Sequence, residues 1–235
     1  MSKRAIILAG GKGMRLKPYT VALPKPLVPI GETPILEIII KQLVKHNFDH
    51  ITITINHLAD IIKAFFGDGS KWGVKIDYSL EEQPLSTMGP LSLIQDLPEN
   101  FLVMNGDILT DLNYSAFIEE HIKSNNLFTV SSHVREEKND YGILEVSDSN
   151  TITGFKEKPI TKFDVSMGIY AANKKILKYI PLNKKYGFDH LMLDMISNQS
   201  PAKVIKHHGY WLDIGRPDDY AKACGDVDKI IKNIL

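Results

Sequence analysis

"AIILAGGKGMR", residues 5–15, places a short apolar run directly before a loop that holds three glycines and an arginine. The apolar run has the length and composition of a buried strand. Gly10, Gly11 and Gly13 let backbone N–H groups approach an anion closely, because no Cβ intervenes. Arg15 adds a guanidinium that can donate to two phosphate oxygens at once. The stretch therefore predicts a strand that ends in an anion-binding loop.

Strands and helices alternate through the N-terminal half that follows. Further runs of strand type occur at residues 50–56, 74–80 and 100–107. Helical spacing of apolar residues occurs between them, at 34–47 and 58–69, and a third helix is expected at 86–97. Parallel strands need crossovers of about this length, so the pattern indicates a mostly parallel sheet with helices on both faces. The apolar stripe of 34–44 is expected to lie in the core.

The second half of the chain is more mixed. Strands with short connections are expected at 128–134, 141–147, 151–158 and 166–173, followed by helices at 189–199 and 217–234. Short connections favour antiparallel pairing. The predicted fold is α/β, a three-layer α/β/α Rossmann-like sandwich whose mixed, mostly parallel sheet gains antiparallel strands late in the chain.

Composition excludes several classes of protein. The 235 residues suffice for one domain with a sizeable core, and 43% of them are hydrophobic. Lys+Arg and Asp+Glu both total 28, so net charge favours neither nucleic acid nor an acidic membrane surface as a partner. No apolar run approaches the ~20 residues that span a bilayer. The single cysteine, Cys224, excludes an internal disulfide and fits a reducing, cytoplasmic location.

Two common phosphate-binding motifs do not fit the glycine loop. A dinucleotide fingerprint that starts at Gly11 would need glycine at position 16, where Leu16 stands, and a P-loop would need lysine where Met14 stands. The plain alternative is a tight turn with a solvated Arg15. The continuation "LPKPLVPI" brackets Lys25 with two prolines, which favours an extended, stiff segment that holds a charge. An ordinary surface loop would have the same sequence.

A longer comparison adds to this interpretation. Residues 8–37, "LAGGKGMRLKPYTVALPKPLVPIGETPILE", closely resemble the signature of the sugar-1-phosphate nucleotidyltransferases. Further stretches resemble that family in the same order: "EEQPLSTMGPL" (81–91), "VMNGDIL" (103–109), "YGILEV" (141–146), "FKEKP" (155–159), "MGIYAAN" (167–173) and "WLDIGRPDDY" (211–220). The resemblance covers essentially the whole chain, and it is greatest to mannose-1-phosphate and heptose-1-phosphate guanylyltransferases.

The resemblance implies a single catalytic domain over 1–235, of the nucleotide-diphospho-sugar transferase type. Its nucleotide-binding part would be about 1–112 and its sugar-phosphate-binding part about 113–235, without the C-terminal β-helix of longer relatives. The implied reaction joins an NTP and a sugar 1-phosphate to give an NDP-sugar and pyrophosphate. The sugar phosphate attacks the α-phosphorus in line, with Mg²⁺ as cofactor, and no covalent protein nucleophile is needed.

The resemblance also implies roles for particular residues. Arg15 would hold the β- and γ-phosphates, and Lys25 would neutralise the α-phosphate. Asp107 and Asp213 would bind Mg²⁺, a hard cation that takes carboxylate, phosphate and water oxygens. The other nucleotide-binding residues would be Leu8, Ala9, Gly10, Gly11, Gly13, Gln83, Leu85, Ser86, Thr87, Gly89 and Gly106. The sugar-phosphate-binding residues would be Asn105, Gly142, Glu157, Lys158, Gly168 and Asp213.

Two positions depart from the family pattern, and several site residues have simpler readings. Met14 replaces the usual threonine, and Ser86 replaces a glycine in the base-contacting turn, which leaves the base less defined than the reaction. Asp107 can instead cap a following helix, Asp213 can pair with Arg216, and Glu157 and Lys158 can be a solvated charge run. The adjacent His207 and His208 point to opposite sides if they lie on a strand, so a structural role is favoured over a shared metal.

Rival functions are a metal-dependent glycosyltransferase and a non-catalytic nucleotide-sugar sensor. The first would need a D-x-D pair, but "NGDILTD" places Asp107 and Asp111 four residues apart. The second would be favoured by loss of Arg15, Lys25, Asp107 or Asp213, and all four are present. GTP with a mannose- or heptose-type 1-phosphate is the preferred substrate pair, and uridylyl, cytidylyl and thymidylyl transfer stay open. A homodimer formed through the amphipathic C-terminal tail, residues 217–235, also stays open.

Overall fold

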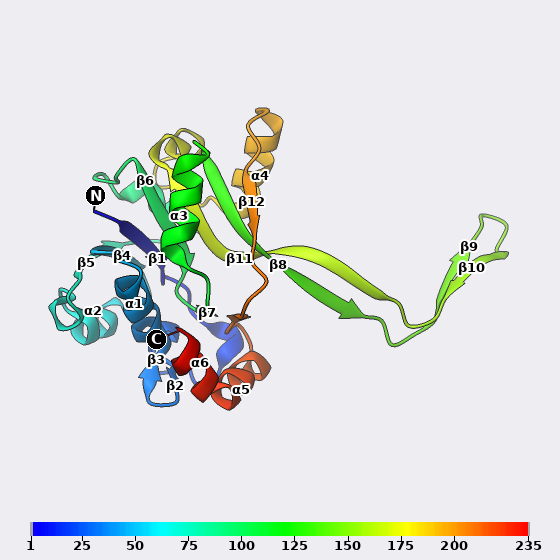
Figure 1. Cartoon of the computed structure of the whole chain (residues 1–235), viewed down its shortest axis with the longest axis horizontal. Coiled ribbons are helices and arrows are strands. Elements are labelled where there is room, and N and C mark those ends of the chain that lie inside the picture. The colour runs from blue at the N-terminus through cyan, green and yellow to red at the C-terminus, as the bar shows by residue number, and fades with distance from the viewer. Residues whose placement is uncertain (1, 235) are drawn as a thin grey trace.

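A seven-stranded sheet forms the centre of the computed structural model, which describes residues 2–234 without the side chains of residues 229–231 and 233. Figure 1 shows this sheet with helices packed around it. In spatial order the strands are β12 (Lys203–Lys206), β8 (Phe128–Lys138), β11 (Ile160–Asn173), β6 (Asn100–Asn105), β1 (Arg4–Leu8), β4 (His50–Ile55) and β5 (Lys75–Leu80).

Most neighbouring strands of this sheet are parallel. β1 pairs in parallel with β4 and β6, β4 with β5, and β12 with β8, whereas β11 is antiparallel to both β6 and β8. The crossovers between β1, β4, β5 and β6 are long enough to return the chain to the same sheet edge. The predicted α/β fold with a mixed, mostly parallel sheet is confirmed.

Alternate residues of β1 face two separate cores. Ala5 and Ile7 pack with one core cluster and Ile6 with the other, and all three are fully buried. This is the period of two that a strand imposes on its side chains. The first core is covered by α1 (Ile35–Lys45), α2 (Ala59–Phe66), α3 (Tyr114–Lys123), α5 (Pro217–Gly225) and α6 (Val227–Ile234). The second is covered by α4 (Phe188–Ser197) and 3-10 turns, which completes three layers.

Helix α1 shows how the apolar pattern produces the core. Ile35, Leu36, Ile39 and Leu43 are fully buried, and the Lys41 and Glu37 side chains form an ion pair of 3.0 Å. Full burial of such side chains contributes roughly 1.5–3 kcal/mol each. The predicted helix and its role in the core are confirmed.

The helix predicted at residues 86–97 is wrong. That segment forms only a short 3-10 turn, Gly89–Leu93. Tertiary hydrogen bonds replace helical ones, because the backbone N–H groups of Met88 and Gly89 both donate to the carbonyl of Tyr186, at 3.0 and 2.9 Å. Pro90 has no N–H to donate in a helix.

Two further differences concern helices. The predicted helix at 217–234 is two helices, α5 and α6, separated at Asp226. Helix α3 was not expected, although its sequence carries the signals. The Asn113 side chain accepts a hydrogen bond of 3.0 Å from the Ala116 N–H, which satisfies a free donor of the first turn. Within residues 2–234, no helix is long and apolar enough to cross a membrane.

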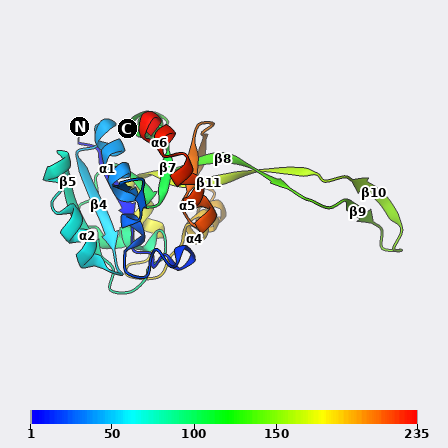
Figure 2. The same ribbon diagram turned by 90° about the horizontal axis from the view of Figure 1, so that it is seen from below.

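The outer halves of β8 and β11 leave the sheet as a long two-stranded arm. We define the arm as residues 134–165, which end in a hairpin of β9 (Ile143–Val146) and β10 (Ile152–Lys156). Figures 1 and 2 show that it projects away from the body in both views. No residue between 133 and 166 is buried. The strands predicted here exist, but those at 128–134 and 166–173 are parts of the longer β8 and β11.

Candidate functional site

The loop after β1 exposes bare backbone at the carboxyl edge of the sheet. Gly13 has a φ of 61°, in the left-handed region that glycine favours, and its carbonyl accepts a 2.8 Å hydrogen bond from Thr20 Oγ1. A Cβ on Gly13 would lie 2.9 Å from Thr20 Cγ2, so a side chain would clash. A Cβ on Gly11 would have no heavy atom within 4 Å. The space beside Gly11 is therefore open to a ligand.

A pocket of about 400 Å³ adjoins this loop. Arg15 lines it from one side and also lies close to Gly215, whose Cβ position is 3.5 Å from Arg15 Nη2. Arg15 is exposed and has no hydrogen-bond partner in residues 2–234, so its donors are available to an anion. The other lining residues are Leu8, Ala9, Gly11, Gly13, Met14, Lys25, Pro26, Thr87, Asn105, Gly106, Asp107 and Gly215.

Lys25 lies in a tight turn, not in the extended segment that the flanking prolines favoured. A 3-10 turn spans Lys25–Leu27, and the Leu27 N–H donates to the Pro24 carbonyl at 2.9 Å. The first turn of a helix leaves its N–H groups unbonded, so Pro26 loses nothing there. The Lys25 ammonium donates to Asp107 Oδ2, and both side chains are mostly buried.

Asp107 and Asp213 are brought together by a small ladder. β7 (Ile108–Thr110) pairs antiparallel with β13 (Trp211–Asp213), and Asp213 lies opposite Ile108. The Ile214 N–H also donates to the Asp107 carbonyl at 3.0 Å. Two carboxylates that are 106 positions apart in the sequence are therefore neighbours: Asp107 lines the pocket, and Asp213 lies beside it.

The electrostatics of this pair suit a bound cation. Burial raises the pKa of Asp213, and the neighbouring Asp107 carboxylate raises it further, while Lys25 and Arg15 oppose the shift. Asp107 Oδ1 is buried and has no hydrogen-bond partner among the described residues. Carboxylate oxygens of this kind are the ligands that hard divalent cations prefer.

Simpler roles for the two aspartates receive no support. The element after Asp107 is a strand, β7, so Asp107 caps no helix. No ion pair joins Asp213 to Arg216 in the part of the chain that the structure describes. His207 Nε2 donates to Asp111 Oδ1 at 2.7 Å. Among the described residues, no three His, Cys, Asp or Glu side chains gather to form a complete metal site.

A second pocket, of about 260 Å³, opens on the other side of Gly11. Ser86, with a φ of 67°, and Thr87 line it, and both were predicted to contact the base. Glu81 also lines it but was not predicted. Its carboxylate is buried, its Oε2 accepts a 3.1 Å hydrogen bond from the Leu85 N–H, and burial raises its pKa. The remaining lining residues are Leu8, Gly10, Thr54, Pro84, Pro90 and Asn105.

Three residues predicted for the base lie beside this pocket without lining it. Gln83 is exposed, and Leu85 is buried. Gly89 packs against the backbone of a neighbouring loop, where its Cβ position is 2.7 Å from the Lys184 carbonyl oxygen. Their base contacts therefore stay a prediction. Leu85 and Gly89 help to fix the conformation of the turn that carries Ser86 and Thr87.

A third pocket, of about 250 Å³, holds three of the residues predicted for the sugar phosphate. Asn105, Gly168 and Asp213 all line it. Gly168 has a φ of 75°, and a Cβ there would lie 2.7 Å from Asn105 Nδ2, so glycine is required by conformation and by space. Thr87 and Asn105 line all three pockets, which therefore adjoin one another.

The other three predicted sugar-phosphate residues lie on the arm. Gly142, Glu157 and Lys158 are all exposed there. At about 3.3 Å per residue, the strand from Ile160 to Gly168 alone spans roughly 26 Å. A lysine side chain is far shorter than this, so the arm holds Lys158 away from the pockets of its own chain.

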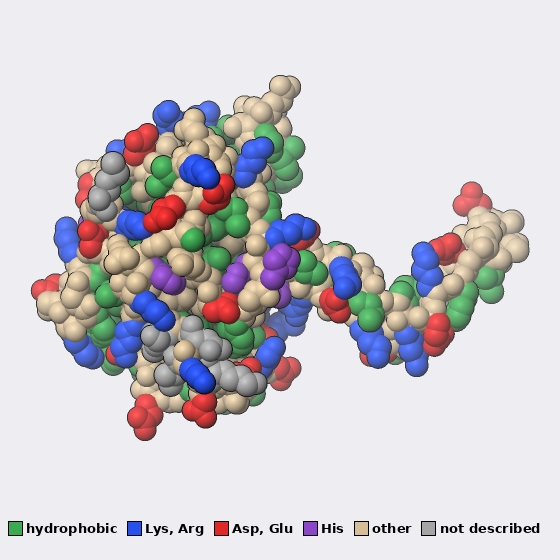
Figure 3. Space-filling view, viewed as in Figure 1, with side chains coloured by type: hydrophobic (Ala, Val, Ile, Leu, Met, Phe, Trp, Pro, Cys, Tyr) green, Lys and Arg blue, Asp and Glu red, His purple; other side chains and the backbone are tan. Residues whose placement is uncertain are grey.

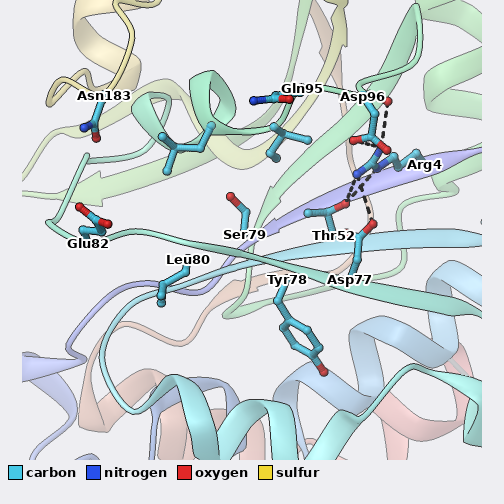
Figure 4. Close-up of a pocket in the computed structure, with 12 residues that line it drawn as sticks. Arg4, Thr52, Asp77, Tyr78, Ser79, Leu80, Glu82, Gln95, Asp96 and Asn183 are labelled. Atoms are coloured by element: carbon cyan, nitrogen blue, oxygen red, sulfur yellow. Dashed lines mark hydrogen bonds and ion pairs between the residues drawn. The ribbon is translucent and has the colours of Figure 1, made fainter.

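A larger cavity, of about 540 Å³, lies beside edge strand β5 and is unrelated to these residues. Figure 4 shows Arg4 at one end of it, surrounded by Thr52, Asp77 and Asp96. Arg4 donates to Thr52 Oγ1 at 2.7 and 2.9 Å and lies 3.0 Å from Asp96 Oδ1. The N–H donors of Arg4 are therefore used within the protein. Arg4 stabilises the sheet edge and is not available to bind an anionic ligand.

Comparisons with known proteins agree with this geometry. The family described as "Nucleotidyl transferase" matches residues 4–229. A D-glycero-alpha-D-manno-heptose 1-phosphate guanylyltransferase from Aneurinibacillus thermoaerophilus is 33% identical, over 97% of this chain and 99% of its own length. A UTP–glucose-1-phosphate uridylyltransferase from Synechocystis is 31% identical over 98% of this chain, which spans only 65% of that relative.

A solved structure shares the fold over nearly the whole chain. HddC from Yersinia pseudotuberculosis, determined in complex with GMP-PN, superposes with a TM-score of 0.72 at 28% identity, over 96% of this chain and 99% of HddC. A Bacillus anthracis protein described as a "Putative Glucose-1-Phosphate Thymidylyltransferase" gives a TM-score of 0.76 at 22% identity, which shows the fold alone. The sequence match, the fold and the pockets that follow β1 lead to one conclusion: the chain belongs to the nucleotidyl transferase family.

Proposed function

We propose that this protein transfers a nucleoside monophosphate from an NTP to a sugar 1-phosphate and releases pyrophosphate. The observation that carries the proposal is the pocket after β1, which Arg15, Lys25 and Asp107 line and beside which the Asp213 carboxylate lies. Both reactants are anions, so the catalyst has to bring like charges together and neutralise the charge of the transition state. Two cations and a carboxylate pair, in and beside one pocket, would supply that chemistry.

Each of the three adjoining pockets is assigned to one part of the two substrates. In our proposal the triphosphate lies over Gly11 and Gly13, the base enters the pocket of Ser86 and Thr87, and the sugar enters the pocket of Gly168. The nucleotide-binding part is then about 1–112, and the sugar-phosphate-binding part about 113–235. Asn105 lines all three pockets and would contact both substrates.

Arg15 and Lys25 have separate tasks in this arrangement. Arg15 is exposed at the loop and has no hydrogen-bond partner among the described residues, so its guanidinium is available to the β- and γ-phosphates and to the leaving pyrophosphate. Lys25 is held by its 3-10 turn between the loop and Asp107, where its ammonium would neutralise the α-phosphate. Neither residue forms a bond to the nucleotide, and the sugar phosphate oxygen is the nucleophile.

Asp107 and Asp213 would hold a divalent cation, Mg²⁺ in our proposal. The unpartnered Asp107 Oδ1 and the repulsion between the two carboxylates fit such a group. When bound, the ion would neutralise phosphate charge. Two protein carboxylates leave the remaining coordination positions to phosphate and water, as Mg²⁺ usually requires.

GTP with a mannose- or heptose-type 1-phosphate is the substrate pair we favour. The guanylyltransferase similarity extends over 99% of the relative's length. Glu81 adds a physical reason, because a carboxylate in the base pocket can accept from the N1–H and N2–H₂ donors of guanine. Uridylyl transfer is the second candidate, since the Synechocystis relative is 31% identical. We expect either reaction to run in the cytosol, where NTPs are available.

A substrate panel tests the proposal. The purified protein is incubated with each of four NTPs and several sugar 1-phosphates, with Mg²⁺ or with EDTA, and pyrophosphate release is measured. We expect one clearly preferred pair, activity only with a divalent cation, and loss of activity in Arg15→Ala. A folded protein that binds nucleotide-sugar but releases no pyrophosphate with any pair would instead be a sensor.

A further inference from the structure

The arm is a part of the molecule that lacks a core of its own. Figure 3 shows apolar side chains exposed along it. A two-stranded ribbon by itself is marginally stable in water, and exposed apolar patches of this kind usually mark contact surfaces. Its exposed large apolar residues are Tyr141, Ile143, Leu144, Val146, Ile152, Phe155, Ile160 and Phe163.

The end of the arm is nevertheless built in a specific way. Gly142 packs under Phe155, where a Cβ would lie 2.6 Å from the ring, and the Asn139 N–H donates to the Pro159 carbonyl at 3.1 Å. Lys158 has a φ of 41°, which is strained for a residue with a side chain. Strained backbone of this kind tends to occur at functional positions. The strained backbone therefore marks Lys158 as a candidate functional residue, and the arm holds it away from its own body.

Only the root of the arm lines a pocket of its own chain, where residues 134–136 lie with Arg15 and Asp213 around a cavity of about 370 Å³. The hairpin end of the arm lines none of the pockets described above. The β8–β11 ladder is unbroken from the Ser132–Ser166 pair to the Lys138–Ile160 pair, so the arm continues straight out of the sheet. Within the β8–β11 ladder the register changes only between Ser166 and Tyr170, at the root of the arm. A bend of the arm onto its own body would have to occur at that root or between the two ladders, at residues 139–142 and 157–159.

The pocket proposed for the sugar lacks the cation that a phosphate needs. Its lining contains no lysine or arginine, and its one charged residue is Asp213. The arginines Arg15, Arg135 and Arg216 line the neighbouring pocket on the other side of Asp213, and no cation lines the sugar pocket itself. Lys158 is a lysine whose closest ion-pair partner is the adjacent Glu157, at 4.0 Å between exposed groups. Such a contact leaves the ammonium available.

Beside the phosphate pocket, the body also exposes an apolar surface. We call this surface the loop patch: Met14, Tyr19, Val21 and Leu23, which are 61, 48, 67 and 42% exposed. Met14 itself lines the phosphate pocket. An apolar hairpin that packed on the loop patch would lie at the entrance of the site. The arm and the loop patch of one chain cannot meet in this structure, because the arm points away from the body (Figure 2).

We propose that two copies of this chain exchange arms. The apolar face of one copy's arm covers the loop patch of the other copy, and Lys158 and Glu157 enter that copy's sugar pocket. Lys158 there supplies the positive charge for the acceptor's phosphate, and Glu157 accepts from sugar hydroxyls. The inference rests on the proposed function for the identity of the acceptor. Each active site is then completed by a second copy.

The first experiment measures mass in solution and needs no activity. Light scattering on the full chain should give a dimer. Leu144→Ser combined with Phe155→Ser, on the arm, should shift the protein to monomer. The matched control is Leu193→Ser with Ile196→Ser on α4, which also carry exposed apolar side chains and should leave the dimer intact. A monomeric wild-type chain, or a dimer that survives the arm changes, overturns the proposal.

The second experiment asks whose arm completes the site. Arg15→Ala and Lys158→Ala chains are co-expressed with different tags, and mixed dimers are isolated through both tags. Each variant alone should lose about 100-fold or more in activity. In arm exchange the mixed dimer has one site with both residues intact, so it should recover about half of wild-type activity. If each arm served its own body, neither site would be intact and activity would stay low, which contradicts the exchange.

A control separates Lys158 from a general effect of charge on the arm. Lys162 lies on the arm, exposed and paired with Glu136 at 2.6 Å, so Lys162→Ala should keep wild-type activity. Failure of the proposed function would show differently, as a wild-type chain without pyrophosphate release on any substrate pair. In that case the mass measurements with the arm and α4 variants still decide whether the arms are exchanged.

Discussion

The strand beside the site and the strand at the end of the arm have similar sequences and opposite surroundings. Ala5, Ile6 and Ile7 of β1 are fully buried between two layers of helices and turns. Leu144 and Val146 of β9 are 52 and 53% exposed. An apolar, β-branched run predicts a strand in both places, but only tertiary packing decides whether the strand is covered. The body therefore fixes its own site, whereas the arm depends on what it contacts.

This difference divides the proposed site into two kinds of residue. Lys25, Asp107 and Asp213 are held by turns and ladders that belong to the buried body. Lys158 is held by a ribbon whose place relative to any pocket is set by docking. Changes in the body should alter chemistry or stability within one chain, and changes in the arm should act through association.

The largest effect is expected from Asp107→Asn. The substitution keeps the shape of the side chain but removes the charge that pairs with Lys25 and would bind the cation, so kcat should fall about 1,000-fold. The unfolding temperature should also fall, because the pair is mostly buried and the substitution leaves the Lys25 ammonium without its charged partner, so activity is compared well below the unfolding transition. Asp111→Asn, four residues further on, is the matched control and should keep near-wild-type activity. Equal losses in both variants would mean that Asp107 has no special role.

The second prediction tests the contrast between body and arm directly. Ile39→Ala in α1 removes a fully buried side chain from the main core and should lower the free energy of unfolding by about 2–5 kcal/mol. Leu144→Ala on the arm removes a half-exposed side chain and should lower it by about 0.5 kcal/mol or less in a dilute, monomeric sample. Chemical denaturation measures both. A comparable loss for Leu144 under dilute conditions would show that the arm packs on its own body.

The third prediction concerns the wall of the sugar pocket. Gly168→Ala should raise the KM for the sugar phosphate about 10-fold or more, since the new Cβ would be 2.7 Å from Asn105 Nδ2 and the φ of 75° disfavours alanine. The KM for the NTP should change less, because Gly168 lines only the sugar pocket. Gly73→Ala is a control for conformation alone: its φ is 69°, but its Cβ position is open. Similar kinetics in the two variants would contradict a steric role.

The sequence was sufficient for most of the fold because the strong signals are local. The strands at 5–10 and 50–56 and the helix at 34–47 each have one period of apolar residues, and all three exist in the structure. The helix at 86–97 failed because tertiary hydrogen bonds to Tyr186 outcompeted helix formation, which no local pattern reveals. The extended conformation expected for Lys25 failed for a related reason, since the first turn of a 3-10 helix tolerates proline.

For the site, residues near one sheet edge were predictable and residues placed by long-range packing were not. The glycine loop, Arg15 and Asp107 follow directly from strands that end at the same edge. Glu81 was missed because a carboxylate after a strand resembles any solvated residue until its burial is known. The location of Glu157 and Lys158 depends on how far β8 and β11 continue beyond the sheet, and strand length is weakly encoded in an exposed, alternating sequence.

The smallest expected effect separates the function of the site from its stability. Burial and the Asp107 carboxylate raise the pKa of Asp213, so the folded protein binds a proton on Asp213 more tightly than the unfolded chain. The resulting stabilisation is present below the unfolded pKa of 3.8 and is lost as pH rises through the higher folded pKa. Ionised Asp213 should therefore destabilise the cation-free protein at neutral pH.

Asp213→Asn removes that charge, so the cation-free variant should unfold at a slightly higher temperature than wild type at pH 7. The difference should shrink as pH falls toward 3.8, where Asp213 of the wild type is protonated. Adding Mg²⁺ should stabilise wild type more than the variant, because only the wild type has both carboxylates to bind it. Thermal scans at several pH values, with and without Mg²⁺, measure all three differences. A variant less stable than wild type at pH 7 without Mg²⁺ would mean that Lys25 and Arg15 outweigh the repulsion between Asp107 and Asp213.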